Sequence, residues 1–177
     1  MIYQSETAER NAAMRVAEIM MAAARTAPKA CAVDRLHTLI LDGEDKNKLT
    51  DAMRELGADL NESYYIRDAG NVDACHCIVM IGISAKPRNL NCALCGTADC
   101  ANAIKQGIPC TLAVTDLGIA VGSAATTAMD YRIDNRILFT AGMAALKIKL
   151  FPDDVKVGYG IGLSVSGKNV FFDRPII

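Results

Sequence analysis

The stretch Cys92-Ala93-Leu94-Cys95-Gly96-Thr97-Ala98-Asp99-Cys100 is followed ten residues later by Cys110, which gives the pattern C-x2-C-G-x3-C-x9-C. These four thiols fall within nineteen residues of a chain that has seven cysteines. Thiolates at such short gaps can converge on one centre, because the backbone between them folds over a small object. Gly96 permits the positive φ that a tight reversal after Cys95 needs. The stretch therefore predicts a metal or cluster site.

Three kinds of site compete for the four thiols. Structural disulfides are typical of secreted proteins, but residues 1–6 lack the basic and apolar regions of a signal peptide. Four thiolates also bind zinc, although zinc sites usually pair two C-x2-C loops and this chain has one. An asymmetric run of four cysteines is typical of iron–sulfur clusters. We therefore expect a 4Fe–4S cluster and keep zinc and disulfides as alternatives.

The pattern C-x2-C-G-x3-C-x2-A with a later cysteine resembles the small cluster-binding module of bacterial corrinoid iron–sulfur proteins and related electron-transfer subunits. In that family four cysteines ligate a 4Fe–4S cluster. The resemblance places the ligands at Cys92, Cys95, Cys100 and Cys110, within an approximate ferredoxin-type region at 75–135.

Nearly all of the chain resembles an uncharacterised bacterial and archaeal family described as containing a ferredoxin domain. The resemblance implies a cofactor but no particular reaction. Besides the cysteine stretch, the matching blocks are Ala27-Pro28-Lys29-Ala30, Ile66-Arg67-Asp68-Ala69, Asp116-Leu117-Gly118-Ile119-Ala120-Val121-Gly122-Ser123-Ala124 and Asp134-Asn135-Arg136.

The fourth ligand has rivals. A helix predicted over 97–106 spans about 15 Å at 1.5 Å per residue, so the chain must double back at Gly107 to bring Cys110 to the cluster. Cys75 and Cys77 lie two residues apart in a predicted buried strand, on one face of it, and are the alternatives. We prefer Cys110, because it follows Pro109 and a proline next to a cysteine is common in cluster-binding loops. Cys31 belongs to no chelating pair.

Composition predicts one globular domain. The 177 residues are 51% hydrophobic, enough for a sizeable core, and with 5% aromatics and no Trp that core is filled by Ala, Met and Leu. The formal net charge of −1 gives no general attraction to nucleic acid or membrane. No apolar run reaches the length of a membrane span. We expect a cytoplasmic protein with reduced thiols.

Residue periodicity predicts an α+β fold in one domain over 1–177, with the cysteine motif inserted as a loop and a short helix. An extended piece is expected at 66–68. Predicted helices are 6–27, 46–56 (ended by Gly57), 97–106 (with Thr97 as N-cap), 116–131 and 141–150; predicted strands are 34–41, 74–83, 110–114 and 155–165.

A second resemblance concerns this fold. The Ala-rich first helix, the Pro28 turn and the strand from Leu36 resemble the opening of the flavin-dependent nitroreductase fold. The helix from Asp116 with its small residues, and the glycine-containing strand after Pro152, resemble its C-terminal half. Those enzymes are homodimers with FMN at the interface. The arginine-rich phosphate-binding segment before their first helix is missing here, so the resemblance implies the fold and a homodimer, and leaves FMN as an alternative cofactor.

Three functions follow. The first is a 4Fe–4S electron-transfer or redox protein that serves an unidentified redox partner protein and loses iron in air. The second is an FMN-linked, nitroreductase-like oxidoreductase, in which the cluster feeds the flavin. The third is a structural metal-binding protein without catalysis. The chain shows neither a Ser/His/Asp pattern nor paired carboxylates and has two histidines, so it carries no hydrolase signal.

Overall fold

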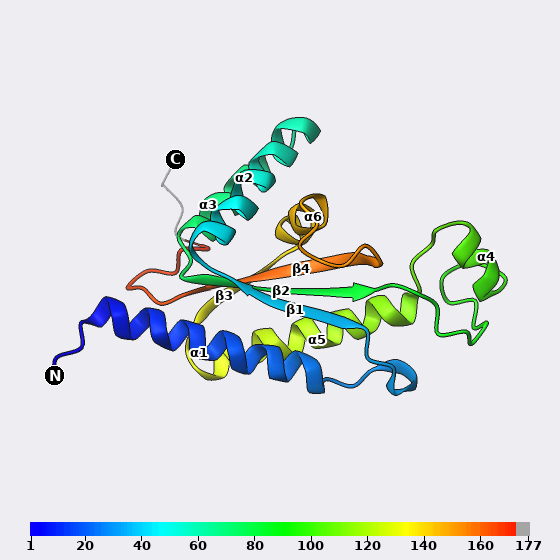
Figure 1. Cartoon of the computed structure of the whole chain (residues 1–177), viewed down its shortest axis with the longest axis horizontal. Coiled ribbons are helices and arrows are strands. Elements are labelled where there is room, and N and C mark those ends of the chain that lie inside the picture. Colours follow the sequence, from blue (N-terminus) through cyan, green and yellow to red (C-terminus); the bar gives the residue numbers. More distant parts are fainter. Residues whose placement is uncertain (173–177) are drawn as a thin grey trace.

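Figure 1 shows the computed structural model of the chain, in which residues 1–172 are described. Within these residues an antiparallel sheet has the strand order β1-β2-β4-β3. Its strands are β1 (Leu36–Leu41), β2 (Cys77–Ser84), β3 (Asp134–Leu138) and β4 (Val155–Ser164). Helices α1 (Ser5–Thr26) and α5 (Thr111–Asp130) cover one face, and α2 (Gly43–Leu60), α3 (Ser63–Asp73) and α6 (Phe139–Lys147) lie on the other. The predicted α+β fold is confirmed.

The remaining segments lie at one end of these layers. A 3₁₀ turn, η1 (Ala30–Ala32), joins α1 to β1. The long connection between β2 and α5 projects beyond the sheet and contains the short helix α4 (Cys100–Lys105) (Figure 1).

Strand β2 lies at the centre of the fold. All eight of its residues are buried, as its unbroken apolar sequence predicts for a strand covered on both faces. Val79 and Ile81 belong to the core under α1 and α5, whereas Ile78 and Met80 belong to the core under α2 and α6.

Small residues set the distance between α1 and α5. Ala17 and Ala24 of α1, and Ala120 and Ala124 of α5, have no exposed surface. The hydroxyl of Ser123 donates to the backbone carbonyl of Ala23 at 3.1 Å. Alanine and serine therefore let the two helices approach closely and compensate for the scarcity of aromatic residues.

Glycines bring α6 onto the sheet. A Cβ at Gly142 would lie 1.8 Å from the carbonyl oxygen of Gly158 in β4, so the helix and strand backbones are in direct contact. At Gly160 a Cβ would lie 2.8 Å from the Cβ of Ala141. The glycines of β4 are therefore positions of close packing in an intact strand.

Two expectations for the segment 43–73 are wrong. Helix α2 continues through Gly57 because that glycine packs under Tyr65, whose Cβ would lie 3.0 Å from an added Cβ. The helix ends at Asn61, which takes a left-handed φ of 56°. The extended piece expected at 66–68 is part of helix α3, which buries Tyr65, Ala69 and Val72 at helical spacing.

One expectation for the second half is also wrong. The strand expected at 110–114 is the first turn of α5, because Ala113 and Leu117 are buried at a four-residue spacing. The polar group at 134–136 belongs to strand β3, which pairs with β4 from Asp134 opposite Ser164 to Leu138 opposite Gly160.

Among the helices of residues 1–172, α5 alone is long and apolar enough to cross a membrane by length and composition. Of its most apolar window, 44% is buried inside the fold. Core helices of water-soluble domains have the same character.

Gly142→Ala should lower the free energy of unfolding by about 1–3 kcal/mol, because its Cβ overlaps the backbone of β4. Gly70→Ala, at an exposed α3 glycine with nothing within 4 Å of its added Cβ, should raise it by about 0.5–1 kcal/mol. Urea unfolding followed by circular dichroism measures both changes. Equal effects of the two substitutions would contradict the close α6–β4 packing.

Candidate functional site

The four cysteines of the motif line one cavity at the end of the molecule. The space that the centre of a water molecule can occupy in it is about 20 Å³, within an empty volume of about 300 Å³ that includes open solvent. Cys110 is buried, Cys95 and Cys100 are half-buried, and Cys92 is exposed, so the cavity has a covered floor and an accessible side. The lining residues are Pro87, Cys92, Ala93, Leu94, Cys95, Asp99, Cys100, Ala103, Cys110 and Thr111.

The backbone curves around this cavity through left-handed residues. Asn89, Asn91, Ala93 and Gly96 have φ values of 58°, 49°, 57° and 80°. The Gly96 N–H donates to the Ala93 carbonyl at 2.9 Å, and the Cys100 N–H donates to the Asn91 side-chain oxygen at 2.9 Å. Left-handed conformations cost energy at residues other than glycine, and their clustering here is typical of functional loops.

Helix α4 is shorter than the sequence predicts. Its N-cap is Asp99, whose side-chain Oδ1 accepts from the Asn102 N–H at 2.7 Å, and Cys100 is its first residue. Gly107 follows with a φ of 68° and turns the chain back. Thr97, the N-cap expected from sequence, instead contacts the sulfur of Cys95.

The Thr97 hydroxyl lies 3.1 Å from the Sγ of Cys95 and 3.0 Å from the Asp99 carbonyl oxygen. The hydroxyl has one proton and can donate it to one acceptor at a time. It donates to the Asp99 carbonyl when Cys95 is a neutral thiol, and it can rotate to donate to the sulfur when Cys95 is a thiolate. Hydrogen bonds from the Thr97 hydroxyl and backbone N–H lower the pKa of Cys95 below its ordinary value. Thr97 therefore favours the form that binds metals, a role that its predicted place at a helix start did not reveal.

Cys110 reaches the cavity because the two ends of the connection meet. Its N–H donates to the Ala85 carbonyl at 3.0 Å. The hydroxyl of the next residue, Thr111, donates to the Leu94 carbonyl at 3.3 Å. The chain thus leaves β2, forms the loop and α4, and returns to its starting point at the head of α5.

Cys75 and Cys77 lie far from this cavity. Cys77 begins β2, whose eight residues span about 26 Å at 3.3 Å each before the loop departs. The expectation that both thiols share one strand face is wrong, because Cys75 precedes the strand. An added Cβ at Gly162 would lie 2.8 Å from the Cys75 sulfur, on the α6 side, whereas Cys77 belongs to the core under α1. Burial raises the pKa of each thiol to about 12.

The arrangement of the cysteine thiols bears on which of the expected kinds of site they could form. All seven cysteines are free, so the disulfide alternative is wrong for this structure. Within residues 1–172 no three His, Cys, Asp or Glu side chains are close enough to hold a single metal ion. The thiolates of a zinc site surround one atom at about 2.3 Å, whereas those of a cubane cluster bind different irons and lie further apart. The four cysteines that line the cavity are therefore not gathered around a single ion in the described part of the chain.

The polar group at 134–136 is engaged locally. Arg136 donates to the Phe171 carbonyl at 3.1 Å, and its guanidinium lies 5.4 Å from the centre of the Phe172 ring. The Asn135 side chain donates to the Ile133 carbonyl at 3.2 Å. These contacts pair the polar side chains of this group with nearby backbone and ring.

Fold and site together define the class: an α+β protein with a cysteine-lined cavity in the loop between β2 and α5. The chain is 34% identical over 175 residues to an uncharacterized protein of Archaeoglobus fulgidus. The alignment covers 93% of this chain and 94% of that relative. Residues 106–174 match the family described as uncharacterized protein containing a ferredoxin domain (DUF2148). The chain belongs to this family. The matched segment contains Cys110 and none of the other three motif cysteines.

Solved structures similar to this fold include flavoproteins. A nitroreductase with bound FMN from Desulfitobacterium hafniense has a TM-score of 0.61 at 14% identity, covering 100% of this chain and 84% of its own. A BluB-like flavoprotein from Clostridium difficile has a TM-score of 0.58 at 15% identity, covering 100% and 86%. An NADPH:FMN oxidoreductase from Vibrio harveyi, complexed with NAD+, has a TM-score of 0.56 at 11% identity, covering 88% and 60%. The nitroreductase-like fold expected from sequence is confirmed.

Alkylation of the metal-free, folded protein with iodoacetamide should separate the thiols. At pH 8 a pKa of about 12 leaves roughly one part in ten thousand of Cys75 and Cys77 as thiolate, so both should stay unmodified.

Thr97→Val should raise the pKa of Cys95, because it removes the hydroxyl donor, and should slow modification of Cys95 at neutral pH. Mass spectrometry of peptides measures each rate, with Cys92 as the internal control. An unchanged Cys95 rate would contradict the role of Thr97.

Proposed function

We propose that the protein binds a 4Fe–4S cluster through Cys92, Cys95, Cys100 and Cys110 and acts in single-electron transfer. The observation that carries this proposal is the single cavity lined by all four thiols. The family description, which names a ferredoxin domain, supports it. When bound, the cluster would supply a one-electron redox centre whose potential depends on hydrogen bonds to sulfur and on exposure.

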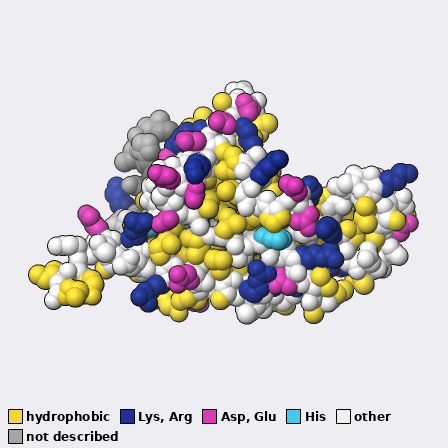
Figure 2. Space-filling model, viewed as in Figure 1, with side chains coloured by type: hydrophobic (Ala, Val, Ile, Leu, Met, Phe, Trp, Pro, Cys, Tyr) yellow, Lys and Arg dark blue, Asp and Glu magenta, His cyan; other side chains and the backbone are white. Residues whose placement is uncertain are grey.

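The chain's own residues give this centre an accessible side. Leu90, Leu94 and Ile104 stand on the surface of the loop and α4 with 52%, 61% and 62% of their area exposed. Asp99 and Lys105 are the charged residues of the segment 89–110. Figure 2 shows this projecting end with few charged side chains on the visible face. An apolar, weakly charged surface beside the exposed Cys92 supports contact with a redox partner protein.

A flavin-linked oxidoreductase is the second candidate. The similar structures that bind or use FMN support it, and so does an apolar surface where β3 meets α6. There Ile137, Phe139 and Met143 have 43%, 48% and 47% of their area exposed. These side chains would offer contact surface to a planar ring. Arg136, the cation beside them, is already held by a backbone carbonyl.

One experiment separates the three functions. Protein purified without oxygen is examined by absorption spectroscopy and assayed for iron and sulfide. The cluster proposal expects a broad band in the blue region and about four irons and four sulfides per chain. A structured flavin spectrum would support the second function, and colourless protein that contains zinc would support a structural metal. Exposure to air should bleach the cluster, because Cys92 is exposed and Cys95 and Cys100 are only half-buried.

Serine substitution should locate the ligands. Cys92→Ser, Cys95→Ser, Cys100→Ser and Cys110→Ser should each abolish or strongly reduce iron loading after anaerobic reconstitution, since each removes a thiolate. Cys31→Ser should load normally. The double variant Cys75→Ser/Cys77→Ser, matched for loss of buried thiols, should retain iron if circular dichroism shows it folded. Iron loss in that double variant but not in Cys110→Ser would make Cys75 or Cys77 the fourth ligand.

We further propose that the protein is a homodimer joined through the outer face of α5. Gly118 and Gly122 lie exposed in mid-helix with nothing within 4 Å of an added Cβ. Glycine there costs about 1 kcal/mol relative to alanine, and it permits close approach of a second backbone. The same face exposes 42% of Ile119 and 65% of Met129, and its other exposed positions are threonines and, at the end of the helix, Asp130. Apart from this last residue the face is uncharged, which is the kind of surface that a second copy covers.

Gly122→Glu should convert the dimer to a monomer, because it places a charge in the contact. Gly70→Glu is the matched control: it adds the same charge at an exposed glycine of α3 that also has nothing within 4 Å. Sedimentation equilibrium measures the mass of each variant. A monomeric parent protein, or a dimeric Gly122→Glu, would reject this interface.

A further inference from the structure

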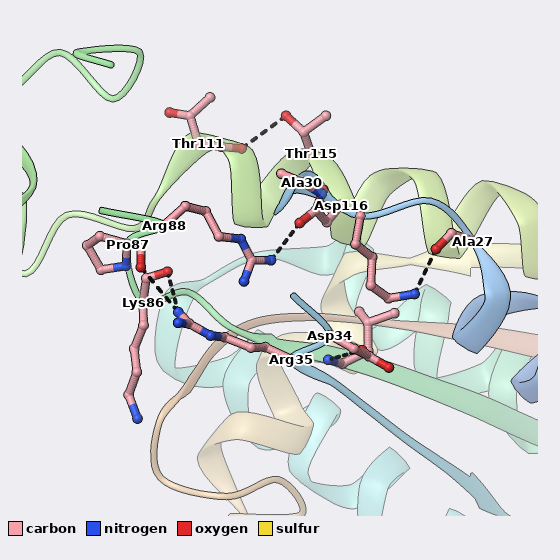
Figure 3. A network of polar contacts seen from close by, with 12 residues as sticks. Ala27, Ala30, Asp34, Arg35, Lys86, Pro87, Arg88, Thr111, Thr115 and Asp116 are labelled. Carbon is pink, nitrogen blue, oxygen red and sulfur yellow. Dashed lines mark hydrogen bonds and ion pairs between the residues drawn. The ribbon is translucent and has the colours of Figure 1, made fainter. Parts of the chain in front are cut away.

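A buried ion pair lies at the base of the cysteine loop. Arg88, in the segment that leaves β2, places its guanidinium 2.6 Å from Asp116 Oδ2 in the second turn of α5. The side chains are 1% and 4% exposed, so the pair is shielded from solvent. Figure 3 shows the Arg88 side chain reaching across to Asp116. The contact joins the chain entering the loop to the helix that follows it.

Asp116 also holds a third segment. Its Oδ1 accepts the Ala30 N–H at 2.9 Å, at the start of the η1 turn (Figure 3). In that turn Cys31 and Ala32 take positive φ values of 57° and 54°. One carboxylate therefore fixes three pieces of backbone that are far apart in sequence.

Other bonds anchor the same base. Arg35 donates to the carbonyl oxygens of Lys86 at 2.9 Å and Pro87 at 3.3 Å. On the return side, the Cys110 N–H donates to the Ala85 carbonyl. Pro87, which adjoins Arg88, and Cys110 both line the cysteine cavity. The position of Arg88 therefore sets the position of one cavity wall.

General stability does not account for this pair. The Nε and Nη1 atoms of Arg88 are buried and have no hydrogen-bond partner within residues 1–172. Unsatisfied buried donors carry a desolvation penalty, and a buried ion pair is often no more stabilising than apolar residues of the same size. What the pair provides is a fixed geometry: two charges that cannot separate without leaving a bare charge in the core.

We infer that Arg88 is a positioning residue that, with Asp116, clamps the cysteine loop in its ligand-ready form before any metal binds. The inference rests on the proposed cluster function for its iron readout alone; the clamp itself can be measured in metal-free protein. The test variant is Arg88→Met/Asp116→Asn. It removes both charges together, and the asparagine oxygen can still accept the Ala30 N–H.

The first measurement uses the metal-free protein and the lysine-specific protease Lys-C. Lys105 is the one lysine between Lys86 and Lys147, so cleavage after it reports opening of the loop and α4. The double variant should be cut about tenfold faster or more while its melting temperature stays within a few degrees of the parent, whereas Asp154→Asn should be cut at the parent rate. That control breaks the exposed Lys86–Asp154 pair, 63% and 39% exposed, in the same segment. Cleavage of the double variant at the parent rate overturns the clamp.

The second measurement is iron release from reconstituted protein to a chelator. Residues that orient metal ligands typically change metal affinity by about 10–100-fold when replaced, and we expect release faster by a similar factor in the double variant. Arg88→Lys keeps the charge but lacks the planar fork. It should give intermediate values in both assays, and it serves as the test variant if the double variant does not fold. If the parent protein takes up no iron, the cluster proposal is refuted and the proteolysis result alone decides the clamp. If folded variants release iron and are cleaved at the parent rates, the clamp is refuted.

Discussion

Burial of β2 on both faces is the constraint on which the remaining architecture depends. A strand without a polar face needs apolar cover on each side, which α1 and α5 supply on one side and α2, α3 and α6 on the other. The neighbouring strands β1 and β4 satisfy its backbone groups. The chain can leave this arrangement only at the strand's ends, and at its C-terminal end the cysteine loop begins. The cavity is therefore attached to a strand whose every residue is buried.

Patterns within one element were readable from the sequence, and contacts between elements were not. The apolar run of β2 and the helical spacing of Val16 and Met20 in α1 predicted both elements well, because a buried face leaves a local periodicity. Helix α3 was missed because its three buried apolar residues occupy a short segment and α2 passes through Gly57. The strand expected at 110–114 reflects the β-branched Thr111 and Val114, whose propensity was overridden by packing of their helical neighbours.

The site divides in the same way. Cysteine spacing predicted one centre, and the structure brings the four thiols to one cavity. The supporting residues were hidden: Arg88 finds its partner 28 positions further on, and no local signal marks such a pair. Thr97 illustrates a different difficulty. A threonine before a helix suits an N-cap, but Asp99 is the N-cap of α4 and the Thr97 hydroxyl contacts the sulfur of Cys95. Cys75 was placed by strand alternation, which does not apply before a strand begins.

The closed base of the loop bears on how such a protein could arise. Because the backbones of Ala85 and Cys110 are hydrogen-bonded to each other, residues 86–109 leave and rejoin the fold at a single point. In polymer terms, each doubling of a loop's length costs only about 0.6 kcal/mol of closure entropy. A gene encoding the layered body could therefore gain or lose this segment as one exchangeable cassette without altering a strand, provided that Asp116, the buried partner of Arg88, changes with it. The same junction is a natural site for transplanting the cassette into another scaffold whose neighbouring backbone ends lie equally close.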